Sequence, residues 1–532
     1  MTRTSRTGRV PFALAAALTA LCAACDGDEG GVDGGDPGLD AAMVMDASAP
    51  LDAPMTPDAG PCGGTCSGAT PVCDPERGTC VACLGNEDCS GATPVCDPSA
   101  QACVGCLAQA DCLGATPVCD TDARECVECL MDGDCEASVP RCDSDAQRCV
   151  ECLAVEDCED GDRCTVDACE ADDTCSHTVR PGCVAAVETG DTHACVIRAG
   201  GTVDCWGANS TGQLGDGSQE DRLTPVAVMG VADAVDVGLG DFHSCVVRAT
   251  GAVVCFGLSS NGRLGIPSPT ESVYTSPQPV GLSDVVQIDA DRDHTCALHS
   301  TGSVSCWGLN GDGRLGDGST VDRETPVAVM GLGDAAAIAV GGGHSCALRT
   351  GGTVSCWGRG GRGQLGNGSM DDASSPVEVV GLTDAVAVSA GSFSTCALRA
   401  TGEVVCWGRN GDGELGDGTT GNRSTPVPVA SVEASQVGVG GDFACALRTS
   451  EQVSCWGDNL KGQLGDGGAP SGSLSPVDAV GLTDAIDLTV GSGHACALRE
   501  TEAVLCWGSN GFGQLGDGTT EDRSMPTDVV GL

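Results

Sequence analysis

The chain of 532 residues is poor in aromatic residues and in lysine. It has six Trp, six Phe, one Tyr and 26 basic residues against 75 acidic ones, which gives a net charge of −49. The only lysine is Lys461. A chain with this charge repels phosphate backbones and shows no basic run, so we expect no binding to nucleic acid. The acidity otherwise indicates solubility.

Catalytic signatures and long apolar segments are also missing. The chain has no Gly-x-Ser-x-Gly turn, no His-Glu-x-x-His pair and no Gly-x-x-x-x-Gly-Lys loop, which excludes the commonest nucleophile, zinc-protease and phosphate-binding motifs. No segment after the N-terminus is long and apolar enough to cross a membrane as a helix. We therefore expect no catalytic residue, no metal site and no cofactor.

The N-terminus indicates export. Three arginines precede an apolar stretch over 12–21, and Ala23 and Ala24 lead into Cys25. This resembles a bacterial lipoprotein signal, which implies that residues 1–25 form a signal peptide ending at a lipidated Cys25. Ordinary cleavage and secretion is the alternative. The protein is expected in the outer membrane or at the cell surface, and residues 26–61 are expected to form an acidic, disordered tether.

Residues 62–183 hold a cysteine-rich repeat with a period of 23 residues, as the spacing of Cys83, Cys106, Cys129 and Cys152 shows. The 38 cysteines of the chain indicate an oxidising compartment, so disulfides are expected here. Their pairing does not follow from the sequence, and zinc held by Cys-x-x-Cys pairs is the alternative. The stretch 158–183 resembles a short extracellular-matrix repeat of slime-mould surface proteins, which implies a structural module.

Residues 184–532 contain a unit that recurs seven times at intervals of 49–51 residues, as measured between successive leading cysteines. Each copy has two cysteines with nine residues between them, followed by an aromatic residue and a glycine. A period in this range, with short strands and glycine turns, is typical of β-propellers. In the fourth copy, strands are expected at 337–340, 345–349, 353–357 and 376–380.

A turn at 350–352 would place Cys346 directly opposite Cys356, at a distance that suits a disulfide. The same spacing in every copy predicts seven disulfides within the blades, and the alternative is that these cysteines are buried and reduced. The predicted pairs are Cys195 with Cys205, Cys245 with Cys255, Cys296 with Cys306, Cys346 with Cys356, Cys396 with Cys406, Cys445 with Cys455, and Cys496 with Cys506.

The text Gly-x-x-His-x-Cys-x-Leu, followed by Gly-x-Val-x-Cys-Trp-Gly and Gly-Gln-Leu-Gly, resembles the repeat of the regulator of chromosome condensation family. The segment 190–215 meets it with one change, Ile197, and the segment 491–516 also with one, Glu502. The resemblance implies a seven-bladed propeller. The family's guanine-nucleotide exchange and chromatin binding are not expected here, because the short units leave little room for the exchange wedge and the chain is acidic.

Five histidines share one position, two residues before the first cysteine of a blade: His193, His243, His294, His344 and His494. Because Ser394 and Phe443 replace them in the fifth and sixth copies, we expect satisfied core histidines rather than metal ligands. The Asp-Gly dipeptides around Asp317 predict turns, and weak calcium binding by these turns is left open. Tyr274 and Phe512 lie where the copies diverge, and they are the candidate binding residues.

The sequence thus predicts an all-β chain, with a seven-bladed β-propeller over 184–532 behind a disulfide-rich, loop-dominated region at 62–183. The expected function is that of a non-enzymatic, monomeric surface lipoprotein whose propeller binds a protein or a surface polymer. A secreted hydrolase or lyase acting in the propeller channel, and a purely structural envelope protein, are the alternatives.

Overall fold

The computed structural model of the chain describes residues 72–74, 79–81, 95–97, 99, 102–104, 118–120, 122–123, 125–135, 139–146, 148–180, 182–267 and 269–532. The predicted signal peptide, the lipidation of Cys25 and the tether at 26–61 lie outside these residues. Tertiary contacts divide the described residues into a cysteine-rich unit that ends at Val179 and a unit that runs from Arg180 to Leu532. In the described residues, no helix is long and apolar enough to span a membrane.

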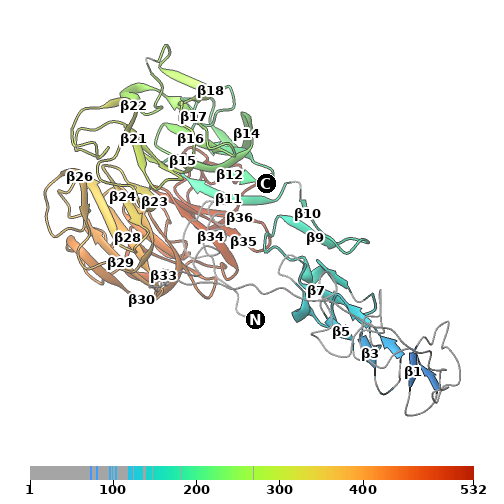
Figure 1. Cartoon of the computed structure of the whole chain (residues 1–532). Coiled ribbons are helices and arrows are strands. Elements are labelled where there is room, and N and C mark those ends of the chain that lie inside the picture. The colour runs from blue at the N-terminus through green and yellow to red at the C-terminus, as the bar shows by residue number, and fades with distance from the viewer. Residues whose placement is uncertain are drawn as a thin grey trace, which may run out of the picture. The chain divides into compact units, whose positions relative to one another are not determined.

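The cysteine-rich unit is a series of two-stranded antiparallel hairpins (Figure 1). The hairpins are β1 (Val72–Asp74) with β2 (Thr79–Val81), β3 (Val95–Asp97) with β4 (Ala102–Val104), β5 (Val118–Asp120) with β6 (Glu125–Val127), β7 (Arg141–Asp143) with β8 (Arg148–Val150), and β9 (Thr165–Cys169) with β10 (Cys175–Val179). The short 3-10 turns η4 (Asp132–Asp134) and η5 (Val155–Asp157) lie between them.

Disulfides join these hairpins to the loops beside them. The bonded pairs are Cys129–Cys142, Cys135–Cys149, Cys152–Cys169 and Cys158–Cys175. Cys142 and Cys149 face each other across β7 and β8, yet each is bonded to a loop cysteine instead. The register of a hairpin therefore does not fix its disulfides in this unit, which is why the sequence left the pairing open.

The second unit is a β-propeller, and each blade is built from consecutive strands, innermost strand first (Figure 1). Blades one to four are β11 (Val184–Thr189), β12 (His193–Arg198), β13 (Thr202–Gly207) and β14 (Arg222–Ala232); β15 (Ala234–Leu239), β16 (His243–Arg248), β17 (Val253–Leu258) and β18 (Val273–Pro279); β19 (Val285–Asp291), β20 (His294–His299), β21 (Val304–Gly308) and β22 (Arg323–Ala328); β23 (Ala335–Val340), β24 (His344–Arg349), β25 (Val354–Gly358) and β26 (Ala373–Glu378).

Blades five to seven complete the ring. They are β27 (Ala385–Ala390), β28 (Ser394–Arg399), β29 (Glu403–Gly408) and β30 (Arg423–Val439); the end of β30 with β31 (Phe443–Arg448), β32 (Val453–Gly457) and β33 (Ser473–Asp478); and β34 (Ala485–Val490), β35 (His494–Arg499), β36 (Val504–Gly508) and β37 (Arg523–Asp528). Five blades are separate four-stranded sheets, and β30 joins blades five and six into one seven-stranded sheet. The short turn η6 (Ser260–Gly262) follows β17.

The fourth blade follows the expected pattern closely, except at its outer strand. The turn after β24 is closed by the Gly352 amide, which donates to the Arg349 carbonyl at 2.9 Å, and Gly352 takes the positive φ of 80° that this turn needs. The outer strand, β26, ends at Glu378 instead of running on to 380. This strand also begins three residues earlier than expected, at Ala373, and the Val379 amide after it still donates to the Val354 carbonyl at 2.9 Å, with the Val379 side chain 1% exposed.

Every blade carries a disulfide between its second and third strands, and the seven bonded pairs are the seven predicted from the sequence. In each pair the two cysteines are directly opposed in the ladder, with Cα atoms 4.0–4.1 Å apart. All fourteen residues are buried. Here the sequence spacing and the register agree, since the turn between the two strands has a constant length. The bonds join Cys195 with Cys205, Cys245 with Cys255, Cys296 with Cys306, Cys346 with Cys356, Cys396 with Cys406, Cys445 with Cys455, and Cys496 with Cys506.

A buried indole joins six of the seven blades to the blade before it. Trp357 of blade four donates its Nε1 hydrogen to the Arg314 carbonyl of blade three at 2.8 Å, and Trp407 donates to the Gln364 carbonyl at 2.9 Å. Both rings are fully buried in the core between neighbouring blades. Phe256 holds this position in blade two, where Ser244 donates to the Gln213 carbonyl instead.

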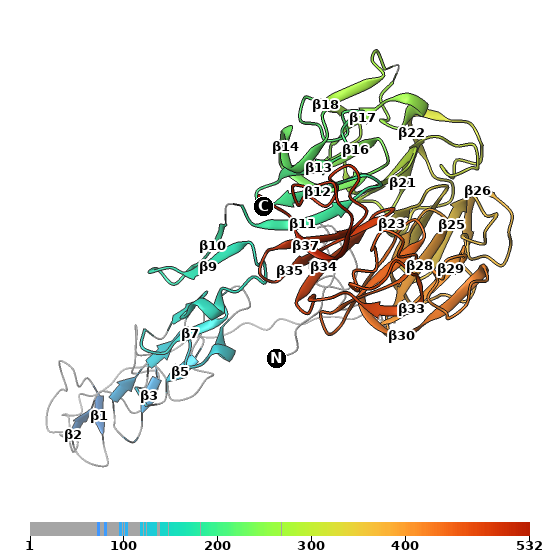
Figure 2. The same ribbon diagram turned by 180° about the vertical axis from the view of Figure 1, so that it is seen from behind.

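The ring closes without strand exchange, because β11 packs beside β34 and β35 (Figures 1 and 2). Trp206 of blade one donates to the Gln514 carbonyl of blade seven at 2.9 Å, and the hydroxyls of Thr189 and Thr489 lie 2.8 Å apart. Val184–Thr189 therefore supplies the inner strand that follows blade seven in the ring.

Candidate binding face

One face of the propeller carries two sets of loops. The channel-mouth loops join the first and second strands of each blade, and a longer outer loop joins the third strand to the fourth. The two sets meet because the amide after the third strand donates to the channel-mouth loop, as Arg359 does to the Gly343 carbonyl at 2.9 Å. We call this side the mouth face. The channel behind it is a cavity of about 130 Å³ lined by the inner strands.

The five histidines at the base of the mouth face are buried core residues, as expected. His193 Nε2 lies 2.8 Å from the Ser244 hydroxyl of the next blade, and His243, His294 and His344 make the same bond to Thr295, Ser345 and Thr395. Each hydroxyl also donates to a backbone carbonyl, so the histidine must donate from Nε2–H. Burial lowers the pKa of His193 and His344 to about 3.

His494 departs from that expectation. It is fully buried, and neither ring nitrogen has a hydrogen-bond partner within the described chain. The next blade is blade one, which carries Ala194 where blades two to five carry serine or threonine. The expectation of satisfied histidines therefore holds for the Nε2 atoms of the other four and fails at the seam between blades seven and one. The Nδ1 atoms of all five lack a partner among the described residues.

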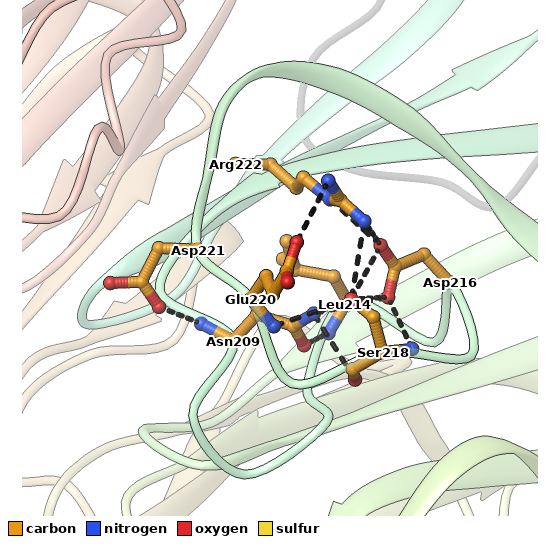
Figure 3. A network of polar contacts seen from close by, with 7 residues as sticks. All are labelled: Asn209, Leu214, Asp216, Ser218, Glu220, Asp221 and Arg222. Carbon is orange, nitrogen blue, oxygen red and sulfur yellow. Dashed lines mark hydrogen bonds and ion pairs between the residues drawn. The ribbon is translucent and has the colours of Figure 1, made fainter.

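The Asp-Gly turns of the outer loops are closed polar networks. Figure 3 shows that Asp216 accepts hydrogen bonds from Asn209 at 3.0 Å, the Ser218 amide at 2.9 Å and Arg222 Nε at 2.9 Å. Asp317 has the same three kinds of partner. Burial would raise the pKa of Asp317, but its hydrogen bonds to Ser319 and Arg323 outweigh that effect and lower it. These carboxylates fix the turns and are already neutralised, which argues against calcium there.

The channel mouth concentrates three carboxyl groups, Asp191, Asp241 and Asp291, on blades one to three. Burial, then the charges of Asp191 and Asp291, raises the pKa of Asp241 to about 9. Burial, then the charge of Asp191, raises the pKa of Asp291 to about 8. Both groups are therefore mainly protonated at neutral pH and can donate hydrogen bonds.

Asp291 stands where the other blades have glycine. A Cβ atom at Gly391 would lie 2.1 Å from the Gly440 carbonyl oxygen, and one at Gly491 would lie 2.2 Å from that of Gly190. The inner ends of most blades are thus too close for side chains. Blade three is the exception, and it sends a carboxyl group into the channel.

Aromatic rings and arginines lie beside the acidic mouth. Phe242 is 41% exposed, and the Arg263 guanidinium lies 5.7 Å from its ring centre. The Phe393 ring has two guanidinium neighbours, Arg292 at 5.7 Å and Arg359 at 5.5 Å. Such cation–π contacts order the arginine side chains.

The two candidate binding residues have different surroundings. Tyr274 lies in β18, is half-buried, and its hydroxyl accepts hydrogen bonds from the Thr270 amide at 3.0 Å and the Glu271 amide at 3.3 Å. It braces the preceding loop. Phe512 lies in the outer loop of blade seven and is 47% exposed, as an interface anchor should be.

Two groups of acidic residues have the spacing of metal ligands. On the mouth face Asp412, Glu414 and Asp442 converge, but Arg409 lies among them, 2.6 Å from Asp412 and 3.3 Å from Glu414. Its guanidinium already occupies the cation position. In the cysteine-rich unit, Asp160, Asp167 and His177 cluster at the surface, where His177 bonds Asp167 at 2.9 Å.

Most residues of the channel mouth were not predicted from the sequence, because their loops are only about three residues long. These residues are Asp191, Asp241, Asp291, Arg292 and Phe393. The available signal was a copy-by-copy comparison of the residues just before each shared histidine. The pair of residues directly before that position changes from blade to blade, as in Asp241-Phe242, Arg292-Asp293 and Gly342-Gly343, whereas the cysteines and most of the Trp-Gly steps recur.

Models of a known repeat family match the propeller part of the chain. A model of the Regulator of chromosome condensation (RCC1) repeat matches 184–213, 234–263, 285–314, 335–364, 385–414, 434–463 and 485–514, one segment in each blade. A second model of the same repeat matches 201–247, 301–348, 351–398, 401–447 and 502–532, and together the two cover more than half of the chain. The chain belongs to the RCC1-repeat family.

The chain is also similar to curated proteins and to solved structures. The "Probable E3 ubiquitin-protein ligase HERC4" of Rattus norvegicus is 31% identical over 147 residues, and that of Mus musculus is 32% identical over 147. The match covers 27% of this chain but only 14% of each ligase. Human WBSCR16 (TM-score 0.57, 23% identity) aligns with 62% of this chain and 94% of its own.

A second solved relative, yeast RCC1 (Prp20) bound to Kap60, has a TM-score of 0.57 and 20% identity, over 62% of this chain and 84% of its own. At these identities the solved structures establish the fold of the RCC1-repeat unit and nothing finer.

Proposed function

We propose that this RCC1-repeat protein is an exported, non-enzymatic binding protein whose mouth face holds a partner protein or surface polymer. A lipid on Cys25 would anchor it, and the tether at 26–61 and the disulfide-linked unit would carry the propeller away from the membrane. The proposal rests on the difference between the blade interiors and the mouth loops. Seven copies keep the same interior, while the mouth loops differ and expose Phe242 and Phe512.

Known relatives support a binding role. Yeast Prp20 was solved bound to Kap60, and a further study of Prp20p from Saccharomyces cerevisiae describes its binding properties to Gsp1p and histones. These partners belong to those proteins. For this chain we carry over only the use of a propeller as a protein-binding surface.

The direct test is capture of partners by the mature, full-length protein from extracts of its native host. Replacing both Phe242 and Phe512 by alanine should reduce capture about tenfold, because exposed aromatic anchors contribute most of the energy of an interface. Val380→Ala is the matched control, since Val380 is 53% exposed outside the mouth loops. Capture that survives the double substitution, or that falls equally in the control, contradicts binding through this face.

Export and anchoring are tested by the intact mass of the mature protein. We expect a chain that begins at acylated Cys25 and whose later cysteines do not react with an alkylating reagent. A mass that begins at Met1, together with reactive thiols, would place the protein in a reducing compartment and contradict the surface role.

A second candidate function is a hydrolase or lyase at the channel mouth. It is favoured by Asp241 and Asp291, whose raised pKa values suit a general acid. Its discriminator is a turnover assay on surface polysaccharides with the Asp291→Asn variant. Activity that the variant abolishes would replace the binding proposal with an enzymatic one.

A further inference from the structure

Three arginines of the propeller lack an ion-pair partner, in a chain with a net charge of −49. Within the described residues, every other propeller arginine lies within 4.0 Å of a carboxylate, but no such contact is found for Arg292, Arg359 or Arg362. All three lie on the mouth face, on blades three and four. Unpaired arginines are unexpected on the surface of a chain in which carboxylates are so abundant.

Glycines in blade four make room for two of these side chains. Arg292 lies across Gly342, where an added Cβ atom would come within 2.9 Å of its Nε. Arg359 lies across Gly343, where the corresponding distance to its Cβ and Cδ atoms is 3.4 Å. The loop Gly341–Gly343 thus provides a flat floor, and both guanidinium groups reach the ring of Phe393 over it.

Arg292 is held there at a cost. Its φ of 43° is in the left-handed region, which is unfavourable for a residue other than glycine, and its Nε is buried without a hydrogen-bond partner among the described residues. The charge of Arg292 lowers the pKa of Asp241 and of Asp291, but burial has the larger effect and raises both. Neither carboxyl group lies within 4.0 Å of the guanidinium, so among the described residues Arg292 forms no ion pair and its Nε has no acceptor.

We propose that Arg292 and Arg359 form a site for a carboxylate group presented by a partner protein. A guanidinium offers paired donors that match the two oxygens of a carboxylate. The half-buried ring of Phe393, which both guanidinium groups reach, suits an apolar group beside that carboxylate. A singly charged carboxylate fits better than a phosphate, since the surrounding acidic surface repels doubly charged anions.

This site rests on the proposed binding function, but its test needs no natural partner. The probe is a fluorescein-labelled peptide amide with two glutamates flanked by phenylalanines, measured by anisotropy against the mature full-length protein at pH 7 and low salt. The comparison peptide has glutamines in place of the glutamates. We expect saturable binding of the glutamate peptide and at least tenfold weaker binding of the glutamine peptide.

The double variant Arg292→Gln, Arg359→Gln should weaken binding of the glutamate peptide by about tenfold or more. The matched control is Arg349→Gln, Arg399→Gln, because both arginines lie at the opposite end of the second strand, already paired with Asp334 and Asp384. The control should bind as the parent does. Equal losses in the two double variants, equal binding of both peptides, or no saturable binding would overturn the proposal.

Two further outcomes identify another source of the anion. Displacement of the peptide by inorganic phosphate at constant ionic strength would overturn the choice of a protein carboxylate. A dimer of the parent protein that the double substitution of Arg292 and Arg359 converts to monomer would assign the carboxylates to a second copy and overturn a foreign partner. A failed partner capture with intact peptide binding would refute the proposed function alone.

Discussion

The seam between blades seven and one has a missing hydroxyl, and restoring it should stabilise the propeller. At four other blade boundaries a serine or threonine hydroxyl lies 2.8–2.9 Å from a histidine Nε2. Ala194 occupies the equivalent place beside His494, and it pairs with Trp206 across the sheet just as Ser345 pairs with Trp357. Ala194→Ser would therefore place its hydroxyl within reach of His494 Nε2.

The magnitude follows from the groups involved. A buried donor without a partner costs about 1–3 kcal/mol, and a hydrogen bond that satisfies it returns most of that amount. The new hydroxyl would also donate to the Gln514 carbonyl, as Ser244 donates to the Gln213 carbonyl at 2.7 Å. We expect the free energy of unfolding to rise by about 1–2 kcal/mol, less the rotamer entropy of one serine.

The assay is guanidinium unfolding at pH 7 with the disulfides intact, followed by tryptophan fluorescence. The matched control is Ala495→Ser, because Ala495 holds the same place in blade seven but faces Phe443, which has no donor. The control should leave the midpoint unchanged or lower it. If Ala194→Ser does not raise the midpoint, or if both serines act alike, the reasoning from the unsatisfied histidine is wrong.

Three other predictions use the same structure. Trp407→Phe should lower the free energy of unfolding by about 1 kcal/mol, because Thr395 still donates to the Gln364 carbonyl. Trp206→Phe should lower it by about 1–3 kcal/mol, because Ala194 leaves the Gln514 carbonyl without a second donor. Chemical unfolding of both variants compares the two losses. The pKa values of Asp241 and Asp291 are raised from 3.8 to about 9 and 8, so their contribution to stability is complete below about pH 4 and is lost as the pH rises towards 9. The Asp241→Asn, Asp291→Asn double variant should therefore have a higher melting temperature than the parent at pH 8 and a smaller difference at pH 5; an unchanged pH dependence would contradict the assigned pKa values. Removing the ion pair of one outer loop by Arg323→Gln should raise the pKa of Asp317 and lower the melting temperature more at pH 7 than at pH 3, which differential scanning calorimetry would detect.

The blade interior was predictable because its constraints are local. The nine-residue gap and the glycine turn place Cys346 opposite Cys356 with no knowledge of the other blades. The seven-fold period then gives the architecture, since a blade cannot bury its faces alone. The outer strand lies two to three residues earlier than expected, at 373–378 instead of 376–380, because its pairing with β25 is decided by tertiary contacts.

The binding face was much less predictable. Its residues come from short loops on different blades, and nothing in the sequence around Arg292 indicates that it reaches Phe393, about 100 residues later. The same holds for His494, which lacks a partner because it lies beside Ala194, about 300 residues earlier in the chain. Tyr274 looked like an exposed anchor because it is the only tyrosine, yet its hydroxyl braces its own loop.

The sequence by itself determined the repeat, the number of blades and the disulfide of each blade, because these depend on spacing within about 50 residues. Only the tertiary structure decided how the ring closes, which buried groups stay unsatisfied, and which side chains share the mouth face. Closing the ring brings together loops that are far apart in the chain. Burial there, with the charges of Asp191 and Asp291, raises the pKa of Asp241, and Arg292 and Arg359 both reach the Phe393 ring with no ion pair among the described residues.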